Sequence, residues 1–173
     1  KKGKLTLPTK FAYVDDLLEL NHEKRIIIRM SVNPEYIINI VEFGTSRLKD
    51  RIEAINKLAD ADYEIGILIA PVIFLDNWKE LYYNLIIELQ EKLNEKAKTK
   101  IFFEIIFMTY SYVHNAINSE AFPNSIQIYD KNTMTGRGRG KYAYKKELRA
   151  EGEEFFRNEL GKYFKNNKIW YIV

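Results

Sequence analysis

The sequence predicts one α/β domain built on a parallel β-sheet. Its 173 residues are 46% hydrophobic and 29% charged, an ordinary mixture for one globular unit with a sizeable core. Short, nearly continuous apolar runs at residues 26–32, 65–70 and 101–108 alternate with segments of helical periodicity. Strands that are apolar on both faces are typical of parallel sheets joined by right-handed helical crossovers. The periodicity leaves open whether this sheet is open or closed into a barrel.

The chain is expected to begin with two strands. Leu5–Thr9 reads as a short strand. Ile26–Val32 is rich in β-branched residues and ends at Asn33 and Pro34, which are typical of a turn after a buried strand. A helix should follow this turn.

The first long helix is expected after Gly44, with a cap at Thr45 or Ser46. Apolar residues recur there at helical spacing and are expected to face the core, whereas charged residues are expected on the solvent side. The apolar set is Leu48, Ile52, Ile55 and Leu58, and the charged set is Lys49, Asp50, Arg51 and Glu53.

The next strand is residues 65–70, bounded by Pro71. Asn77 stands three residues before Glu80, the spacing of a capping box, and predicts the start of a long helix. Its inner face would be Trp78, Leu81, Leu85, Leu89 and Leu93, and its last turn would carry Lys96, Lys98 and Lys100. Another buried strand, residues 101–108, should follow.

The sequence changes character after residue 118. Residues 1–118 therefore read as strand–helix units, and residues 119–173 as a basic hairpin, a helix and a strand that close on the same domain. The elements expected in this second part are a short strand at Asn124–Tyr129, a glycine-rich segment at Thr135–Gly140, a helix at Lys145–Phe164 and a final strand at Ile169–Val173.

The chain contains no cysteine. This excludes a disulfide framework, a thiolate zinc site, a catalytic cysteine and an iron–sulfur cluster held by this chain itself. No apolar run reaches the ~20 residues of a membrane helix, and Lys1–Lys4 does not open a secretory signal. We therefore expect a cytoplasmic protein with no membrane partner. The lack of an initiator methionine predicts that the beginning of the chain is missing.

The isolated histidines and tryptophans have ordinary structural interpretations. His22 and His114 have no partner at metal-ligand spacing, so we expect surface or hydrogen-bonded loop residues. Trp78 and Trp170 fall on predicted inner faces and are expected in the core. The sequence therefore identifies no metal ligand and leaves the catalytic residues unknown.

The strongest local feature is a basic segment, residues 131–146. It holds six basic residues and no acidic one, although the whole chain has a formal charge of +3. The six are Lys131, Arg137, Arg139, Lys141, Lys145 and Lys146. Gly136, Gly138 and Gly140 would let a backbone approach closely, and Tyr142 and Tyr144 could stack on bases or pack in the core, which we favour.

This pattern points to nucleic acid as a partner. If the segment is extended, Arg137, Arg139 and Lys141 project to one side. The alternative is a solvated basic turn. A nucleotide phosphate loop is disfavoured, because the Gly-x4-Gly-Lys-Ser/Thr pattern is absent.

Small polar residues at successive strand ends form a second candidate site. In parallel α/β proteins, ligands bind beyond the carboxyl ends of the strands. The residues at these ends are Lys10, Ser31, Asn33, Ala70 and Pro71. Taken singly, each of these residues is also of a kind that is common where a strand passes into a turn.

Several of these segments together resemble a known family. In order and spacing, the sequence from about Thr9 onward is similar to spore photoproduct lyases, radical S-adenosylmethionine enzymes that repair thymine dimers in spore DNA. The segments that carry the resemblance are Arg29–Asn33, Glu42–Leu48, Ile69–Pro71, Trp78–Glu80 and Gly140–Tyr144. The Gly-Thr-Ser-Arg-Leu and Gly-Lys-Tyr-x-Tyr pieces are fairly specific in combination.

The resemblance implies the C-terminal half of a partial (β/α)6 TIM-like barrel, followed by a DNA-binding hairpin. It also implies S-adenosylmethionine and a [4Fe–4S] cluster as cofactors. The cysteines that ligate the cluster and the cysteine that donates hydrogen lie upstream of the matched region. The resemblance therefore implies either a missing N-terminal half or a relative that has lost the activity.

The resemblance also assigns site residues. Lys10, Ser31, Asn33 and Ala70 match positions lining the S-adenosylmethionine pocket or the lesion site, and Arg137 matches a hairpin arginine that holds the lesion. The full DNA-binding set would be Arg137, Arg139, Lys141 and Tyr142. The family's hairpin tip, Gly-Arg-Tyr-Gly, is replaced here by Gly-Arg-Gly-Arg, so the tyrosine that contacts the lesion in the family has no counterpart at this tip.

The leading hypothesis is the C-terminal part of a spore photoproduct lyase-like enzyme, in which a 5′-deoxyadenosyl radical abstracts hydrogen from the lesion. The alternatives are a non-catalytic nucleic-acid-binding α/β module and a radical S-adenosylmethionine relative with another substrate.

Overall fold

The computed structural model describes residues 3–173 and is built around a five-stranded parallel sheet. The strand order is β1-β2-β3-β4-β8, and every neighbouring pair is parallel. The strands are β1 (Leu5–Thr9), β2 (Ile26–Val32), β3 (Glu64–Val72), β4 (Ile101–Phe107) and β8 (Ile169–Ile172). The predicted α/β class with a parallel sheet is confirmed.

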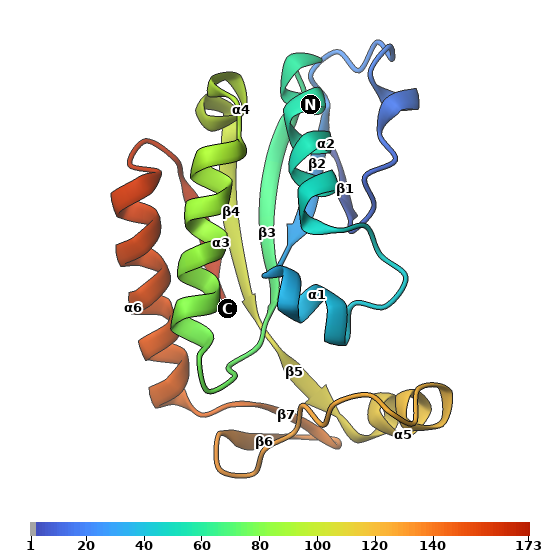
Figure 1. The fold of residues 1–173 in the computed structure, drawn as a ribbon, viewed down its shortest axis with the longest axis vertical. Helices are drawn as coiled ribbons and strands as arrows, with labels where there is room; N and C mark the ends of the chain where they lie inside the picture. The colour runs from blue at the N-terminus through green and yellow to red at the C-terminus, as the bar shows by residue number, and fades with distance from the viewer. Residues whose placement is uncertain (1–2) are drawn as a thin grey trace.

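Three long helices lie on one face of this sheet, in front of it in Figure 1. They are α2 (Leu48–Asp60), α3 (Trp78–Lys92) and α6 (Lys146–Tyr163). The shorter helices are η1 (Asp15–Leu17), α1 (Glu35–Val41), α4 (Glu95–Lys100) and α5 (Tyr112–Ala121). None of the described helices combines the length and apolar character needed to cross a bilayer.

The core lies between the sheet and these helices. Because side chains alternate along a strand, Ile65, Ile67 and Ile69 of β3 face the helices and are fully buried. The helices α3 and α6 pack through aromatic pairs such as Tyr82 and Phe156, whose ring centroids are 5.3 Å apart. The opposite face of β3 carries Gly66, Leu68 and Ala70, and these three long helices do not cover it.

A small antiparallel sheet continues from the end of β4. Its order is β5-β7-β6, formed by β5 (Thr109–Ser111), β6 (Met134–Gly138) and β7 (Lys141–Tyr144). It lies below the parallel sheet in Figure 1. The hydroxyl of Tyr144 accepts a hydrogen bond from Phe74 N at 3.1 Å, which ties β7 to the loop after β3.

The predicted strands of the parallel sheet and the predicted long helices are confirmed, with corrections at their ends. Strand β3 continues through Pro71 to Val72. Proline lacks an N–H, and it is tolerated here because the pairing with β4 shifts register between Ile69 and Val72. The predicted basic last turn of α3 is wrong, because a separate helix, α4, starts after Asn94, whose side chain accepts from Ala97 N at 2.7 Å.

Other local predictions were also wrong. Residues 124–129 form no strand, and α5 was not predicted. Neither Thr45 nor Ser46 caps α2; instead, Leu48 N donates to Glu35 Oε2 at 2.9 Å. Asn77 precedes α3 without a side-chain cap, so the capping box does not form.

Trp170 is 41% exposed instead of buried in the core. Its ring stacks on Phe102, with centroids 3.8 Å apart. His22 stacks on Tyr63 and its Nε2 lies 3.0 Å from Ala61 O, as expected for a hydrogen-bonded loop residue.

Candidate functional site

The structure brings the four predicted strand-end residues together. Lys10 follows β1, Ser31 lies near the end of β2, Asn33 follows β2, and Ala70 lies on β3. Lys10 Nζ donates to Ser31 Oγ at 3.1 Å and to Ala70 O at 3.0 Å. Ser31 Oγ donates to Ala70 O at 2.8 Å. Asn33 Nδ2 donates to Pro71 O at 3.1 Å, so all four residues belong to one polar cluster.

Two buried residues that sequence reasoning did not select complete this cluster. Glu42 Oε1 accepts from Lys10 Nζ and, at 2.8 Å, from Asn33 Nδ2. Glu42 Oε2 accepts from Arg51 Nη2 at 2.8 Å. The Arg51 side chain is fully buried, which corrects the prediction that it faces solvent. Arg51 lies three residues after Leu48 and therefore on the apolar stripe of α2. This spacing could have predicted its burial, but its charge led to a surface assignment.

The electrostatics favour a charged cluster. Burial alone would raise the pKa of Glu42, but hydrogen bonds from Lys10 and Asn33 and the charges of Lys10 and Arg51 outweigh burial, so this pKa lies below its ordinary value. Burial lowers the pKa of Lys10, and the hydrogen bond and charge of Glu42 oppose this effect without cancelling it. Glu42 is therefore ionised at neutral pH and acts purely as an acceptor.

A cavity of about 520 Å³ opens beside Lys10 on the sheet face that the long helices leave uncovered. The polar residues of its lining are Thr9, Lys10, Ser31 and Thr45. Its walls are mostly apolar, formed by Pro8, Phe11, Leu68, Ala70, Pro71 and Ile106. A pocket with apolar walls and a few convergent polar groups is the usual form of a small-molecule site. A ligand with a planar or aliphatic body and one charged end fits this lining.

The residues around this cavity do not fit a metal centre or an iron–sulfur cluster. The sequence has no cysteine, and residues 3–173 contain no group of histidine, aspartate and glutamate placed to hold a metal ion. Thiolates are the ligands that iron–sulfur clusters require.

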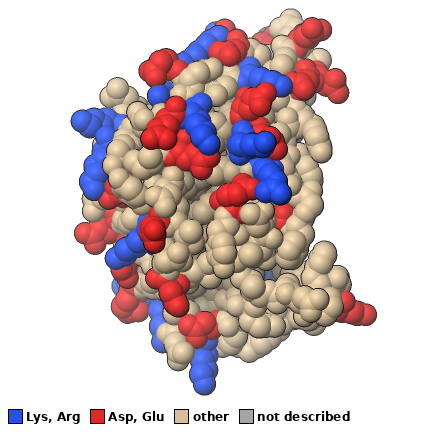
Figure 2. All heavy atoms as spheres, viewed as in Figure 1, with Lys and Arg blue, Asp and Glu red and all other residues tan. Residues whose placement is uncertain are grey.

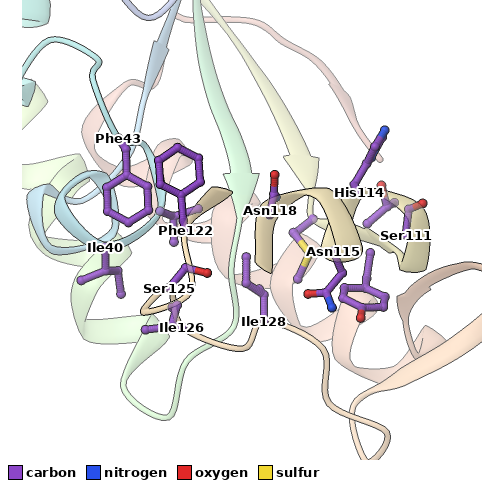
Figure 3. A pocket seen from close by; sticks show the side chains of 14 residues that line it. Ile40, Phe43, Ser111, His114, Asn115, Asn118, Phe122, Ser125, Ile126 and Ile128 are labelled. Atoms are coloured by element: carbon purple, nitrogen blue, oxygen red, sulfur yellow. The ribbon is translucent and has the colours of Figure 1, made fainter. Parts of the chain in front are cut away.

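A second cavity, of about 330 Å³, lies between α1, α5 and the loop that follows α5. Figure 3 shows Phe43 and Phe122 side by side at one end and His114 and Asn115 toward the other. The two phenylalanine rings are 5.3 Å apart between centroids. Its lining carries no aspartate, glutamate, lysine or arginine, and it shares no residue with the cavity at Lys10.

The basic residues of the 131–146 segment are all exposed. Arg137 lies on β6 and Lys141 on β7, and the chain reverses between them at Arg139 and Gly140, both of which have positive φ. Gly138 pairs with Lys141 across this turn. The expectation that Arg137, Arg139 and Lys141 project to one side of an extended segment is therefore not met. They surround a hairpin tip instead.

The tyrosines of the hairpin pack, as favoured. Tyr144 is buried, and Tyr142 lies in a cluster with Tyr110, Tyr112 and Tyr129, at ring-centroid distances of 5.1–6.1 Å.

Figure 2 shows acidic and basic side chains interspersed over the helical face, whereas the surface over α5 is largely uncharged.

Comparison with known proteins gives one consistent result. The family model described as spore photoproduct lyase matches residues 1–173. The chain is 34% identical over 175 residues to the spore photoproduct lyase of Bacillus subtilis strain 168, covering 99% of this chain and 51% of that protein. It is 33% identical over 171 residues to the protein of that name from Clostridium acetobutylicum, covering 95% and 49%. The chain thus spans about half the length of the curated relatives it matches.

Solved structures agree. A spore photoproduct lyase mutant with bound AdoMet and dinucleoside spore photoproduct superposes with a TM-score of 0.92 and 28% identity, covering 99% of this chain and 52% of that one. A spore photoproduct lyase complexed with dinucleoside spore photoproduct gives the same TM-score, identity and coverage.

Proposed function

Because this chain belongs to the spore photoproduct lyase family, we propose that it is the part of such an enzyme that binds S-adenosylmethionine and presents a basic hairpin to damaged DNA. The observation that carries this proposal is the cavity of about 520 Å³ beside Lys10 and Ser31. In the proposed architecture, residues 1–118 form half of a partial (β/α)6 barrel and residues 119–173 complete the domain. The helix-free face of the sheet would be the inner face of that barrel.

The chemistry of the pocket supports S-adenosylmethionine as the ligand. Its amino-acid end carries a carboxylate, which the ammonium group of Lys10 suits. Its adenine ring is planar, and the faces of that ring suit an apolar wall containing Phe11, Leu68 and Ile106. When bound, this cofactor supplies the 5′-deoxyadenosyl group that abstracts hydrogen from the lesion. The residues of this chain bind and orient it.

The residues of this chain cannot ligate the [4Fe–4S] cluster of the proposed enzyme. Because no residue of this chain supplies a thiolate, its ligands in the proposed enzyme come from outside residues 1–173. The cysteine-free sequence is also the observation that favours the second candidate function, a nucleic-acid-binding module without catalysis.

The hairpin supports DNA as the partner of either function. Arg137, Arg139 and Lys141 are exposed around its tip. Gly136, Gly138 and Gly140 leave its backbone accessible, so phosphate groups can approach closely. Flipping a lesion out of the duplex costs ~a few kcal/mol, and damage lowers this cost.

Titration calorimetry of the protein with S-adenosylmethionine tests the proposal. We expect binding by the parent protein and at least tenfold weaker binding by Lys10→Met, which keeps the length of the side chain but removes its charge. Lys57→Met is the matched control, because Lys57 lies on α2 in surface ion pairs with Asp15 and Glu53. DNA binding without any S-adenosylmethionine binding would overturn the enzyme proposal in favour of the non-catalytic module.

A further inference from the structure

Glu42 connects the ligand pocket to the core of the domain. It follows α1, and its side chain is 3% exposed. Its Oε1 atom faces the pocket cluster and accepts from Lys10 and Asn33. Its Oε2 atom faces the core and accepts from Arg51 on α2. One carboxylate therefore joins the residue after β1, the residue after β2 and a long helix.

Arg51 holds this carboxylate from a fixed position. Its Nε donates to Ser46 O at 2.8 Å and its Nη1 to Ser31 O at 3.0 Å. Its Nη2 donates to Thr45 Oγ1 at 2.7 Å as well as to Glu42. The guanidinium group is planar and its donors form a rigid fork, so these acceptors define its orientation. Glu42 is consequently held on its core side by a fully buried group that is itself fixed by three other hydrogen bonds.

Glu42 also orients the buried side chain of Asn33. Asn33 donates one amide N–H to Glu42 and the other to Pro71 O, while Asn33 Oδ1 accepts from Tyr82 at 3.2 Å. Burial raises the pKa of Tyr82 well above its ordinary value, so this hydroxyl stays a donor. The carboxylate thus fixes the orientation of this fully buried amide, which is not part of the pocket lining.

Lys10 depends on the same carboxylate. The other two acceptors of its ammonium group, Ser31 Oγ and Ala70 O, are neutral. Glu42 is its charged partner, so this contact adds the attraction between opposite charges that the two neutral acceptors do not supply. Without it, a flexible four-carbon side chain would be held at the pocket mouth by neutral acceptors alone.

We propose that Glu42, held by Arg51, is a positioning residue that fixes Lys10 in the geometry that receives the ligand. This inference rests on the proposed function for the ligand's identity, but not for the order of Lys10 itself. Glu42 does not touch the ligand in this scheme. It acts through Lys10, which lines the pocket.

The experiment combines a ligand-free measurement with a double-mutant cycle. Heteronuclear NMR of the lysine ammonium groups, assigned with Lys10→Met, reports whether Lys10 is ordered. We expect a protected Lys10 signal in the parent and its loss in Glu42→Gln. Calorimetry with S-adenosylmethionine should show that Glu42→Gln weakens binding by about tenfold in the parent and by clearly less in the Lys10→Met background, because residues acting through one contact are non-additive.

Two further variants separate positioning from stability. Glu42→Asp keeps the charge that compensates Arg51 but withdraws it by one methylene, so it should fold and still weaken binding. Glu104→Gln is the matched control, because Glu104 is also a buried carboxylate paired with an arginine, Arg29, outside the pocket lining. We expect it to lower the melting temperature while leaving the Lys10 signal and the affinity unchanged.

The outcomes distinguish this inference from the proposed function. If the parent does not bind S-adenosylmethionine, the proposed function is overturned, and the ligand role of Glu42 with it. If the parent binds, but Glu42→Gln and Glu42→Asp leave the Lys10 signal intact or weaken binding equally in both backgrounds, the positioning role alone is overturned.

Discussion

Arg29 on β2 reaches across Gly66 of β3 to pair with Glu104 on β4, with Arg29 Nε 2.6 Å from Glu104 Oε2. Arg29 Nη2 also donates to the hydroxyl of Tyr171 on β8 at 2.8 Å. The missing side chain at position 66 makes this crossing possible. A Cβ atom there would lie 3.2 Å from Arg29 Cγ and 2.7 Å from the ring of Phe102.

Gly66→Ala should therefore destabilise the fold. The Phe102 ring cannot yield easily, because it is sandwiched against Trp170. Overpacking of this kind costs ~1–3 kcal/mol, and urea denaturation will measure it. Gly161→Ala on α6 is the control, because a Cβ there meets no atom of residues 3–173 within 4 Å. It should be neutral or stabilising by up to ~1 kcal/mol, and equal losses in the two variants would contradict the steric argument.

Glu42 should make stability depend on pH in acid. Its folded-state pKa lies below the ordinary value of 4.5, so it contributes stability that is present above that value and is lost as pH falls through the lower, folded-state pKa. Glu42→Gln should lower stability at pH 7 and flatten its decline below pH 4.5. Urea denaturation at several pH values will show this. Glu153→Gln removes an exposed pair with Arg157 and should leave the acid limb nearly unchanged.

The parallel sheet could be predicted because its strands are continuous apolar runs. Residues 26–32 match β2, and the 65–70 and 101–108 runs lie within two residues of β3 and β4. Helix α5 could not be predicted in this way, because none of its residues is buried and no apolar stripe marks it. Hydrophobic periodicity marks helices that bury one face, and α5 has no buried residue.

The candidate site was half predictable for a similar reason. Strand ends can be located from sequence, so Lys10, Ser31, Asn33 and Ala70 could be predicted to lie close together. Glu42 and Arg51 could not be predicted there, because a charged residue is ordinarily assigned to the surface. Their burial depends on each other and on backbone acceptors 5 and 20 residues from Arg51, which no local pattern reveals.

Ser31→Ala and Asn33→Ala should each weaken S-adenosylmethionine binding. Loss of one hydrogen-bonding group costs ~0.5–1.5 kcal/mol, and more where a charged partner remains. Asn33→Ala should be the larger effect, since it deprives buried Glu42 of a donor, whereas Ser31→Ala leaves Lys10 two other acceptors. Calorimetry will measure both. Unchanged affinity in both variants would remove these residues from the site.

Replacing Arg137, Arg139 and Lys141 together by alanine should weaken binding to duplex DNA of any sequence. For each DNA phosphate that the variant no longer neutralises, the slope of log affinity against log salt should become shallower by ~0.9. Fluorescence anisotropy across a salt series will measure both quantities. The control replaces Lys92, Arg157 and Lys162, three exposed residues of the helical face, and removes the same charge. Equal losses of DNA affinity in the two triple variants would mean that only the total charge matters and that the hairpin has no specific role.

Arg137→Ala alone separates lesion recognition from phosphate contact. If Arg137 holds the lesion, its loss should weaken binding to DNA containing a thymine dimer several-fold more than binding to the undamaged duplex, because only the damaged site is flipped toward the hairpin at low cost. Arg139→Ala is the matched control, since it removes the same charge two residues away at the tip, where its positive φ marks the turn. Competition anisotropy with the two duplexes will give the ratio. Equal losses on both would leave Arg137 a phosphate contact, and a larger lesion-specific loss for Arg139→Ala would mean that the altered tip has transferred the role to its neighbour.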